Sequence, residues 1–130
     1  MALRVTTTLL IGLSLLLLLL SWSVIQQRRK EGVSLGDGDQ LMMRRKIRAQ
    51  GNLAEYGPMF VLLIAVAEIT SGASVLLWVF GLIFFIARVL HGIGLSYTQN
   101  SPVLRSMGMV LTLTAFLGAI GLNVLVLLGT

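Results

Sequence analysis

Four long apolar stretches, separated by short polar segments, account for most of this chain. A helix that crosses a membrane needs about 20 mostly apolar residues, and each stretch is long enough to provide them. We expect helices at about residues 5–27, 40–71, 74–97 and 102–128. The pattern therefore predicts an all-α fold, an integral membrane four-helix bundle, formed as a single domain over residues 1–130.

The polar segments predict the connections. Residues 31–40 are rich in glycine and aspartate and should form the first loop, and residues 71–74 should form a tight turn. Residues 98–102 make a short loop in which Pro102 is well placed to start the last helix. The first apolar stretch lies near the N-terminus, as a signal peptide does. Its positive n-region is thin and residues 21–23 are a poor cleavage site, so we expect a retained helix.

Composition and charge support a membrane protein and not a soluble globule. The chain is 56% hydrophobic and only 12% charged, although its formal net charge is +5. That charge does not indicate nucleic-acid binding, because no such motif accompanies it. Most of the Lys and Arg residues lie between the first two apolar stretches: Arg28, Arg29, Lys30, Arg44, Arg45, Lys46 and Arg48. Basic loops stay in the cytoplasm, so we expect both termini to face the periplasm or lumen.

Several kinds of chemistry are excluded by the residues that are missing. The chain has no cysteine, which excludes disulfides, thiolate metal sites and a nucleophilic cysteine. It has one histidine, His91, which excludes a histidine-rich metal cluster. We therefore expect no metal site.

Polar residues share one face of the second predicted helix. Arg48, Asn52 and Glu55 follow one another at spacings of four and three, and the helix then becomes apolar. On the third predicted helix, Arg88 and His91 are three residues apart and also share a face. Ionisable groups at membrane depth are costly and mostly functional. The predicted topology places both sets at the cytoplasmic level, so this layer is our candidate site.

The charge of this layer indicates an anionic ligand. Arg28 or Arg29, Arg48, Arg88 and Arg105 converge on it with only Glu55 to neutralise them, and arginine binds carboxylates in a bidentate manner. A small anion meeting an apolar co-substrate from the lipid phase would fit.

Structural interpretations of the same residues stay open. Glu55 could form an ion pair with Arg48 or with Arg88, and His91 could be an interhelical hydrogen-bonding residue. Arg44, Arg45 and Lys46 are expected to be interfacial anchors. Glu68 and Asn123, toward the opposite end, are expected to make local hydrogen bonds.

Residues 48–58 carry the pattern R-x-Q-x-N-x-x-E-Y-x-P, and residues 87–91 read A-R-x-x-H. Together with the dibasic pair at residues 28–29 and the Arg-Ser pair at residues 105–106, they closely resemble the MAPEG superfamily, the membrane-associated proteins in eicosanoid and glutathione metabolism. The likeness covers nearly the whole chain and is strongest to short bacterial members of unassigned substrate, so we expect a location in a bacterial inner membrane. It implies a homotrimer that binds glutathione between subunits on the cytoplasmic side.

The resemblance also implies roles for individual residues. Arg105, with Ser106, would activate the thiol, which attacks a lipophilic electrophile or a hydroperoxide arriving from the bilayer. Glu55 would hold the amino group of glutathione and Arg48 a carboxylate, with Arg29 reaching in from the neighbouring subunit. The full set of implied glutathione contacts is Arg29, Arg48, Gln50, Asn52, Glu55, Tyr56, Arg88 and His91.

The sequence departs from the family pattern at two positions. Leu95 stands where mammalian members often carry a ligand-binding tyrosine, and Met109 replaces another tyrosine early in the last helix. We therefore weigh two functions: a glutathione-dependent membrane transferase or peroxidase, and a catalytically inactive binding or scaffold protein on the same fold. A small four-helix multidrug exporter is disfavoured, because such exporters carry a glutamate in the first helix, which is absent from the apolar run here.

Overall fold

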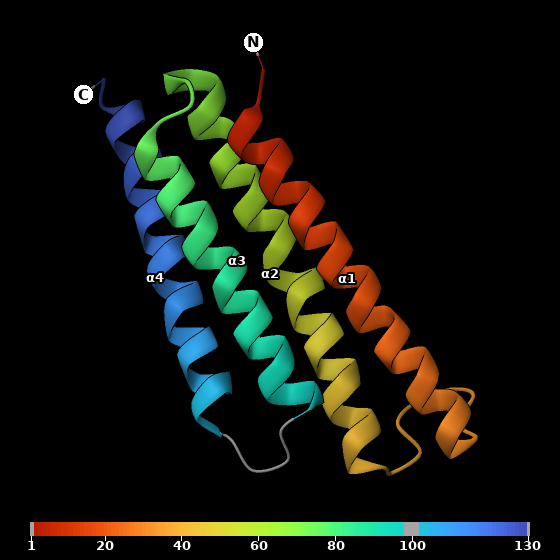
Figure 1. Ribbon diagram of the computed structural model, residues 1–130. Coiled ribbons are helices and arrows are strands. Elements are labelled where there is room, and N and C mark those ends of the chain that lie inside the picture. Colours follow the sequence, from red (N-terminus) through yellow and green to blue (C-terminus); the bar gives the residue numbers. More distant parts are fainter. Residues whose placement is uncertain (1, 98–101, 130) are drawn as a thin grey trace.

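The computed structural model describes residues 2–97 and 102–129, and four helices form a single bundle (Figure 1). The helices are α1 (Arg4–Glu31), α2 (Leu41–Ser71), α3 (Val75–Ser96) and α4 (Pro102–Leu127). Each is long and apolar enough to cross a membrane. The predicted all-α membrane bundle is confirmed. Most of the loop expected at residues 98–102 lies outside the described residues.

The two ends of the bundle differ in what they contain. Both termini and the α2–α3 turn lie at one end, which we call the terminal end, and the α1–α2 loop lies at the other, which we call the basic end (Figure 1). α2 contacts the other three helices, whereas α1 and α4 do not touch each other within the described residues. The last part of α3 and the first part of α4 therefore meet the polar half of α2 at the basic end.

α1 extends four residues beyond the predicted end at residue 27. Its last turn contains Arg28, Arg29 and Lys30, and it ends at Gly32, whose φ of 67° lies in the left-handed region that favours glycine. Cationic side chains interact favourably with the partial negative charge at a helix C-terminus. The basic cluster is therefore part of α1, whereas the predicted helix ended just before it.

The predicted anchor residues connect α2 to its neighbours at the basic end. Arg44 Nε donates to Asp37 Oδ2 in the first loop at 2.7 Å, and this contact holds the pKa of the Asp37 carboxyl below its usual value. Arg45 Nη2 donates to the Gly94 carbonyl of α3 at 3.2 Å. These contacts fit the role expected of interfacial residues.

Aromatic rings fill the centre of the bundle. Phe60 of α2 and Phe84 of α3 are wholly buried, and their rings stack with centroids 3.9 Å apart. Phe116 of α4 meets both rings edge-on. α3 and α4 approach closely beside this cluster, because a Cβ placed on Gly108 would lie 2.8 Å from the Ala87 carbonyl oxygen. The core therefore fixes α2, α3 and α4 relative to one another.

A buried carboxylate joins α1 to α2 at the terminal end. Glu68 is 0% exposed and accepts hydrogen bonds from the backbone N–H groups of Val5 and Thr6, at 2.9 and 2.8 Å, and from the Thr6 hydroxyl at 2.7 Å. Leu3 at the start of α1 supplies no side-chain cap, so Glu68 performs that role from another helix. At the same end, Asn123 Nδ2 donates to the Leu63 carbonyl of α2 at 3.0 Å.

Candidate functional site

The guanidinium group of Arg88 lies at the centre of the candidate site. Arg88 is only 2% exposed on α3, and its Nη1 donates to Asn52 Oδ1 of α2. Its Nη2 donates to Thr112 Oγ1 of α4 and, at 3.4 Å, to the Gly108 carbonyl, whereas Nε has no hydrogen-bond partner among the described residues. One side chain therefore joins three helices at the level where the sequence predicted a polar layer.

Aromatic faces surround this buried cation instead of a carboxylate. The Arg88 Cζ lies 5.5 Å from the ring centroid of Tyr56 and 5.6 Å from that of Phe84. Such contacts stabilise a cation through the quadrupole of the ring. Glu55, the partner that one structural interpretation assigned to Arg88, is bound to Arg48. Among the described residues no carboxylate neutralises Arg88.

His91 lies one turn further along α3 and is also buried. Its Nδ1 is 3.2 Å from the Arg105 carbonyl oxygen at the start of α4. A carbonyl can only accept, so this contact requires the proton to be on Nδ1 and leaves Nε2 as the acceptor. His91 therefore connects the end of α3 to the first turn of α4, one turn of α3 beyond Arg88.

Arg48 and Glu55 face outward from this cluster. Their side chains form an ion pair at 3.2 Å, and each is 56% exposed. An exposed pair of this kind contributes little stability, typically about 0–1 kcal/mol. Asn52, between them on the same face, turns inward to Arg88. The predicted stripe therefore lies at the boundary between the core and the outer surface of the subunit.

Arg105 and Ser106 are the fourth and fifth residues of α4 and are exposed at the same end. The backbone of α4 is held close to α3 here, because a Cβ on Gly94 would lie 2.8 Å from the Arg105 backbone nitrogen. Within the described residues, the Arg105 side chain forms no ion pair. Its guanidinium group is therefore available to a ligand at the surface.

Comparison with known proteins matches this chain to the sequence profile of the MAPEG family over residues 6–125. The chain belongs to the MAPEG family. The recognition made from residues 48–58 and 87–91 is confirmed, and the protein is a membrane protein of a family associated with glutathione and eicosanoid metabolism.

Two curated relatives of this MAPEG protein are both named inner membrane protein YecN. They come from Escherichia coli strains K12 and O6:H1, and each is 28% identical to the chain over 81 residues. The matched part covers 62% of this chain and 62% of the relative, which is less than two thirds of the relative's length.

Two residues that the MAPEG resemblance assigned to the site lie apart from the Arg88 cluster within one subunit. Gln50 donates from α2 to Ser21 Oγ of α1 at 2.8 Å. Arg29 lies over the ring of Trp22 on its own helix, with its Cζ 6.0 Å from the centroid. Both belong to the α1 side of the subunit, and α1 does not contact α4 within the described residues. The structure therefore does not bring these two residues together with the Arg88 cluster.

Sequence reasoning missed Thr112, which binds both Arg88 and, at 2.7 Å, the Gly108 carbonyl. Thr112 and Thr114 are two hydroxyl residues in an apolar run, and the sequence alone does not distinguish them. A usable signal was present in the spacing of small residues along α4, at positions 108, 112, 115 and 119, all of which are buried. Small residues at such spacing mark the face on which membrane helices approach closely. Thr112 is the polar member of that face and lies opposite Arg88.

Proposed function

We propose that this MAPEG protein binds glutathione at the basic end of the bundle and transfers its thiolate to lipophilic electrophiles, or uses it to reduce hydroperoxides. The observation that carries the proposal is the excess of guanidinium groups over carboxylates. Arg48, Arg88 and Arg105 lie on three helices at the basic end, and among the described residues only Glu55 forms an ion pair with any of them, at 3.2 Å from Arg48. Glutathione has two carboxylates and one ammonium group, so its net charge at neutral pH is negative and complements this layer.

The exposure of each residue suggests which residues contact the ligand and which support the wall of the site. Arg48, Glu55 and Arg105 are exposed and can contact a ligand directly. We assign a ligand carboxylate to Arg48 and the ligand amino group to Glu55. Arg88 and Asn52 are buried and bonded to each other, so they position the wall of the site. Tyr56 and His91 complete that wall.

A homotrimer would bring the remaining residues into the site. Arg29 and Gln50 lie on the α1 side of one subunit, away from Arg105, as described above. A neighbouring subunit could present its Arg29 to the ligand held by Arg48. This arrangement places glutathione between subunits, where it meets substrates that diffuse in the bilayer.

The reaction follows from thiol chemistry. The thiolate is the nucleophile, and a nearby cation lowers the pKa of a thiol. Arg105, with Ser106 beside it, would stabilise the glutathione thiolate. Its sulfur forms a bond to an electrophilic carbon while the leaving group departs with the bonding electrons. With a hydroperoxide, sulfur attacks the terminal oxygen and releases the alcohol, and a second glutathione converts the resulting sulfenic acid to the disulfide and water.

We place the protein in a bacterial inner membrane, as the name of the Escherichia coli relative states for that protein. The basic first loop would face the cytoplasm and both termini the periplasm.

Turnover in detergent tests the proposal. Purified protein should conjugate glutathione to a chromogenic aryl halide, and Arg105→Ala should lower kcat at least tenfold. Lys30→Ala removes an exposed cation at the same end of the bundle and is the matched control, with kcat unchanged. If wild-type protein turns over neither aryl halides nor hydroperoxides, the enzymatic proposal is wrong.

The second candidate is a binding or scaffold protein without catalysis. It is favoured by Leu95 and Met109, which occupy positions where characterised members often carry tyrosine. Leu95 is buried against the core, and Tyr97 is exposed, with its ring 5.8 Å from Lys46 Nζ. The Tyr97 phenol therefore does not take the place of a side chain at residue 95. This candidate predicts stabilisation by glutathione without turnover.

A further inference from the structure

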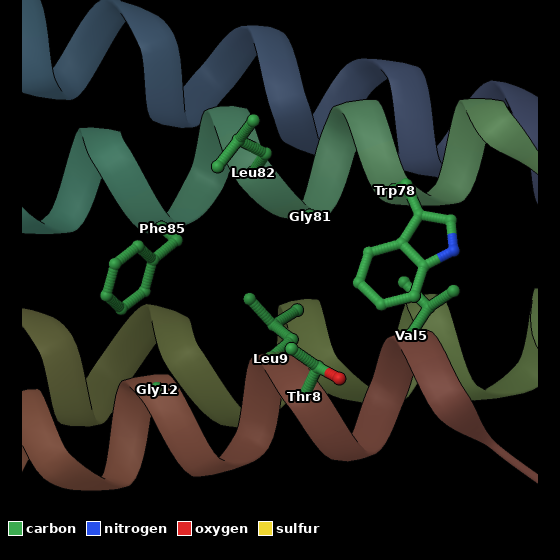
Figure 2. A pocket seen from close by; sticks show the side chains of 8 residues that line it. All are labelled: Val5, Thr8, Leu9, Gly12, Trp78, Gly81, Leu82 and Phe85. Carbon is green, nitrogen blue, oxygen red and sulfur yellow. The ribbon is translucent and has the colours of Figure 1, made fainter.

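A groove between α1 and α3 opens on the side of the bundle near the terminal end (Figure 2). Its volume is about 200 Å³, and its walls include Val5, Leu9 and Gly12 of α1 and Trp78, Gly81 and Phe85 of α3. Figure 2 shows Trp78 and Phe85 reaching from α3 toward α1, with the bare backbone of Gly81 between them. The groove lies on the terminal side of the Arg88 cluster, and its wall contains none of the charged residues of that cluster. We therefore assign it no part in the thiol chemistry.

Gly81 leaves room for the groove because it has no side chain, and the buried Glu68 carboxylate holds the start of α1 in place beside it. A Cβ on Gly81 would lie 3.8 Å from Val5 Cγ1 and 3.9 Å from Leu9 Cδ2, so a methyl group fits there without a clash. The first turn of α1 is held against α2 through the hydrogen bonds that Glu68 accepts from Val5 and Thr6. α1 is therefore fixed on its α2 side, and the groove on its α3 side is preformed.

The groove continues into a second, open cavity at the terminal end. Thr8 and Trp78 line both, and the second cavity adds Arg4 and Thr7 at its rim. Of the ten Lys and Arg residues in the sequence, the other nine lie at residue 28 or beyond, on the parts of the helices toward the basic end (Figure 1). The Arg4 side chain is exposed and pairs with no carboxylate among the described residues. An apolar slot thus leads to a lone cation.

We propose that the groove and the second cavity together bind one anionic glycerophospholipid from the leaflet at the terminal end. The acyl chain lies along Gly81, and the phosphate binds Arg4 beside Trp78. Seven residues of α3 separate Trp78 from Phe85, or about 10 Å of helix axis. That length fits within one leaflet, which is half of a hydrocarbon core about 30 Å thick. A cavity of about 150 Å³ already takes a benzene ring, so this groove has room for several methylenes.

Trp78 and Arg4 are suited to the headgroup level. Tryptophan is enriched at membrane–water interfaces, where its ring is apolar on its faces and donates a hydrogen bond at its edge. Trp78 is the fourth residue of α3 and directly follows the α2–α3 turn. Arginine binds phosphate oxygens in a bidentate manner.

Photolabelling in nanodiscs tests this assignment. The full chain is reconstituted with phosphatidylglycerol or phosphatidylcholine that carries a diazirine on one acyl chain, and labelled peptides are mapped by mass spectrometry. We expect phosphatidylglycerol to label residues 5–12 and 78–85 preferentially. Arg4→Gln should lower the preference for phosphatidylglycerol about fivefold, since one basic residue near an anionic surface has an effect of that order. Lys30→Gln, at the opposite end, should leave the preference unchanged.

Larger side chains at Gly81 test whether the groove holds the acyl chain. Gly81→Leu should reduce labelling of both segments at least fivefold, and Gly81→Ala, which fits without a clash, should reduce it partially. Gly121→Leu is the matched control, because a Cβ on Gly121 meets nothing within 4 Å. Equal labelling by the two lipids, labels spread evenly over all four helices, or an unchanged pattern in Arg4→Gln and both Gly81 variants would each overturn the proposal. A groove protected from both lipids by a second copy of the chain would also overturn it.

Discussion

Replacing Glu68 with Gln tests the cap that this residue provides to another helix. The carboxylate is wholly buried and accepts three hydrogen bonds of 2.9 Å or shorter from Val5 and Thr6. Glutamine has almost the same size but keeps only one oxygen. One of the two backbone N–H groups must then face an amide NH₂ group instead of an acceptor. The substitution therefore isolates the cap from any change in packing.

The size of the effect follows from these contacts. A buried donor left without a partner costs about 1–3 kcal/mol, and losing a negative charge beside a helix N-terminus adds about 0.3–1 kcal/mol. We expect Glu68→Gln to lower the free energy of unfolding by about 1–4 kcal/mol. Glu55→Gln is the matched control on the same helix. Its exposed carboxylate makes one contact at 3.2 Å, so the loss should stay within about 1 kcal/mol.

Unfolding by dodecyl sulfate in mixed micelles, followed by far-UV circular dichroism, measures both variants. Thr6→Val completes a double-mutant cycle with Glu68→Gln, in which we expect a coupling energy above about 0.5 kcal/mol. Equal losses for the Glu68 and Glu55 variants, with no coupling to Thr6, would refute the role of Glu68 as the cap of α1.

Two further predictions concern helix packing and the first loop. Gly108→Ala should destabilise the protein by about 1–3 kcal/mol in the same unfolding assay, because the new Cβ would lie 2.8 Å from backbone atoms of α3. Gly121→Ala is its control. A Cβ at Gly121 meets nothing within 4 Å, so this variant should be neutral or more stable by up to about 1 kcal/mol. Arg44 lowers the pKa of the Asp37 carboxyl in the folded protein. The stability that their contact contributes is therefore present above the pKa of Asp37 in the unfolded chain, and it is lost as the pH falls through the lower pKa of Asp37 in the folded protein. The NMR shift of the Asp39 amide, which donates to Asp37, should titrate below about pH 4, and Arg44→Gln should move that midpoint upward.

The bundle and the level of the site could be predicted from sequence because lipid imposes a simple rule. A guanidinium group within an apolar run, such as Arg88, requires polar partners. Arg48, Asn52 and Glu55 share one helical face at the same depth, so an ion pair between Arg48 and Glu55 was one of the alternatives open from the sequence, and the structure contains it. The other alternative, Glu55 as the partner of Arg88, is wrong, because Arg88 donates to Asn52 instead. Depth and helical periodicity narrowed the choice of partners but did not assign the partner of Arg88.

Other contacts depend on how helices rotate and slide against one another, which periodicity does not determine. Glu68 was expected to make a local hydrogen bond, but its partners are 62 and 63 residues away on α1. Gln50 shares a motif with Asn52, yet it points to Ser21 on α1. Neighbouring positions on one helix differ by about 100° in direction, so a two-residue step separates partners on different helices. Assigning them requires the docked bundle.

The central claim is that the basic end of this MAPEG protein binds an anionic thiol. Equilibrium dialysis of radiolabelled glutathione against the detergent-solubilised protein tests it most directly. We predict saturable binding at millimolar or lower concentration, weakened about tenfold or more by Arg48→Ala and by Glu55→Gln, and unchanged by Lys30→Ala. A tenfold loss corresponds to about 1.4 kcal/mol of binding free energy. Absence of saturable binding, or equal binding by all three variants and the wild type, would contradict the account.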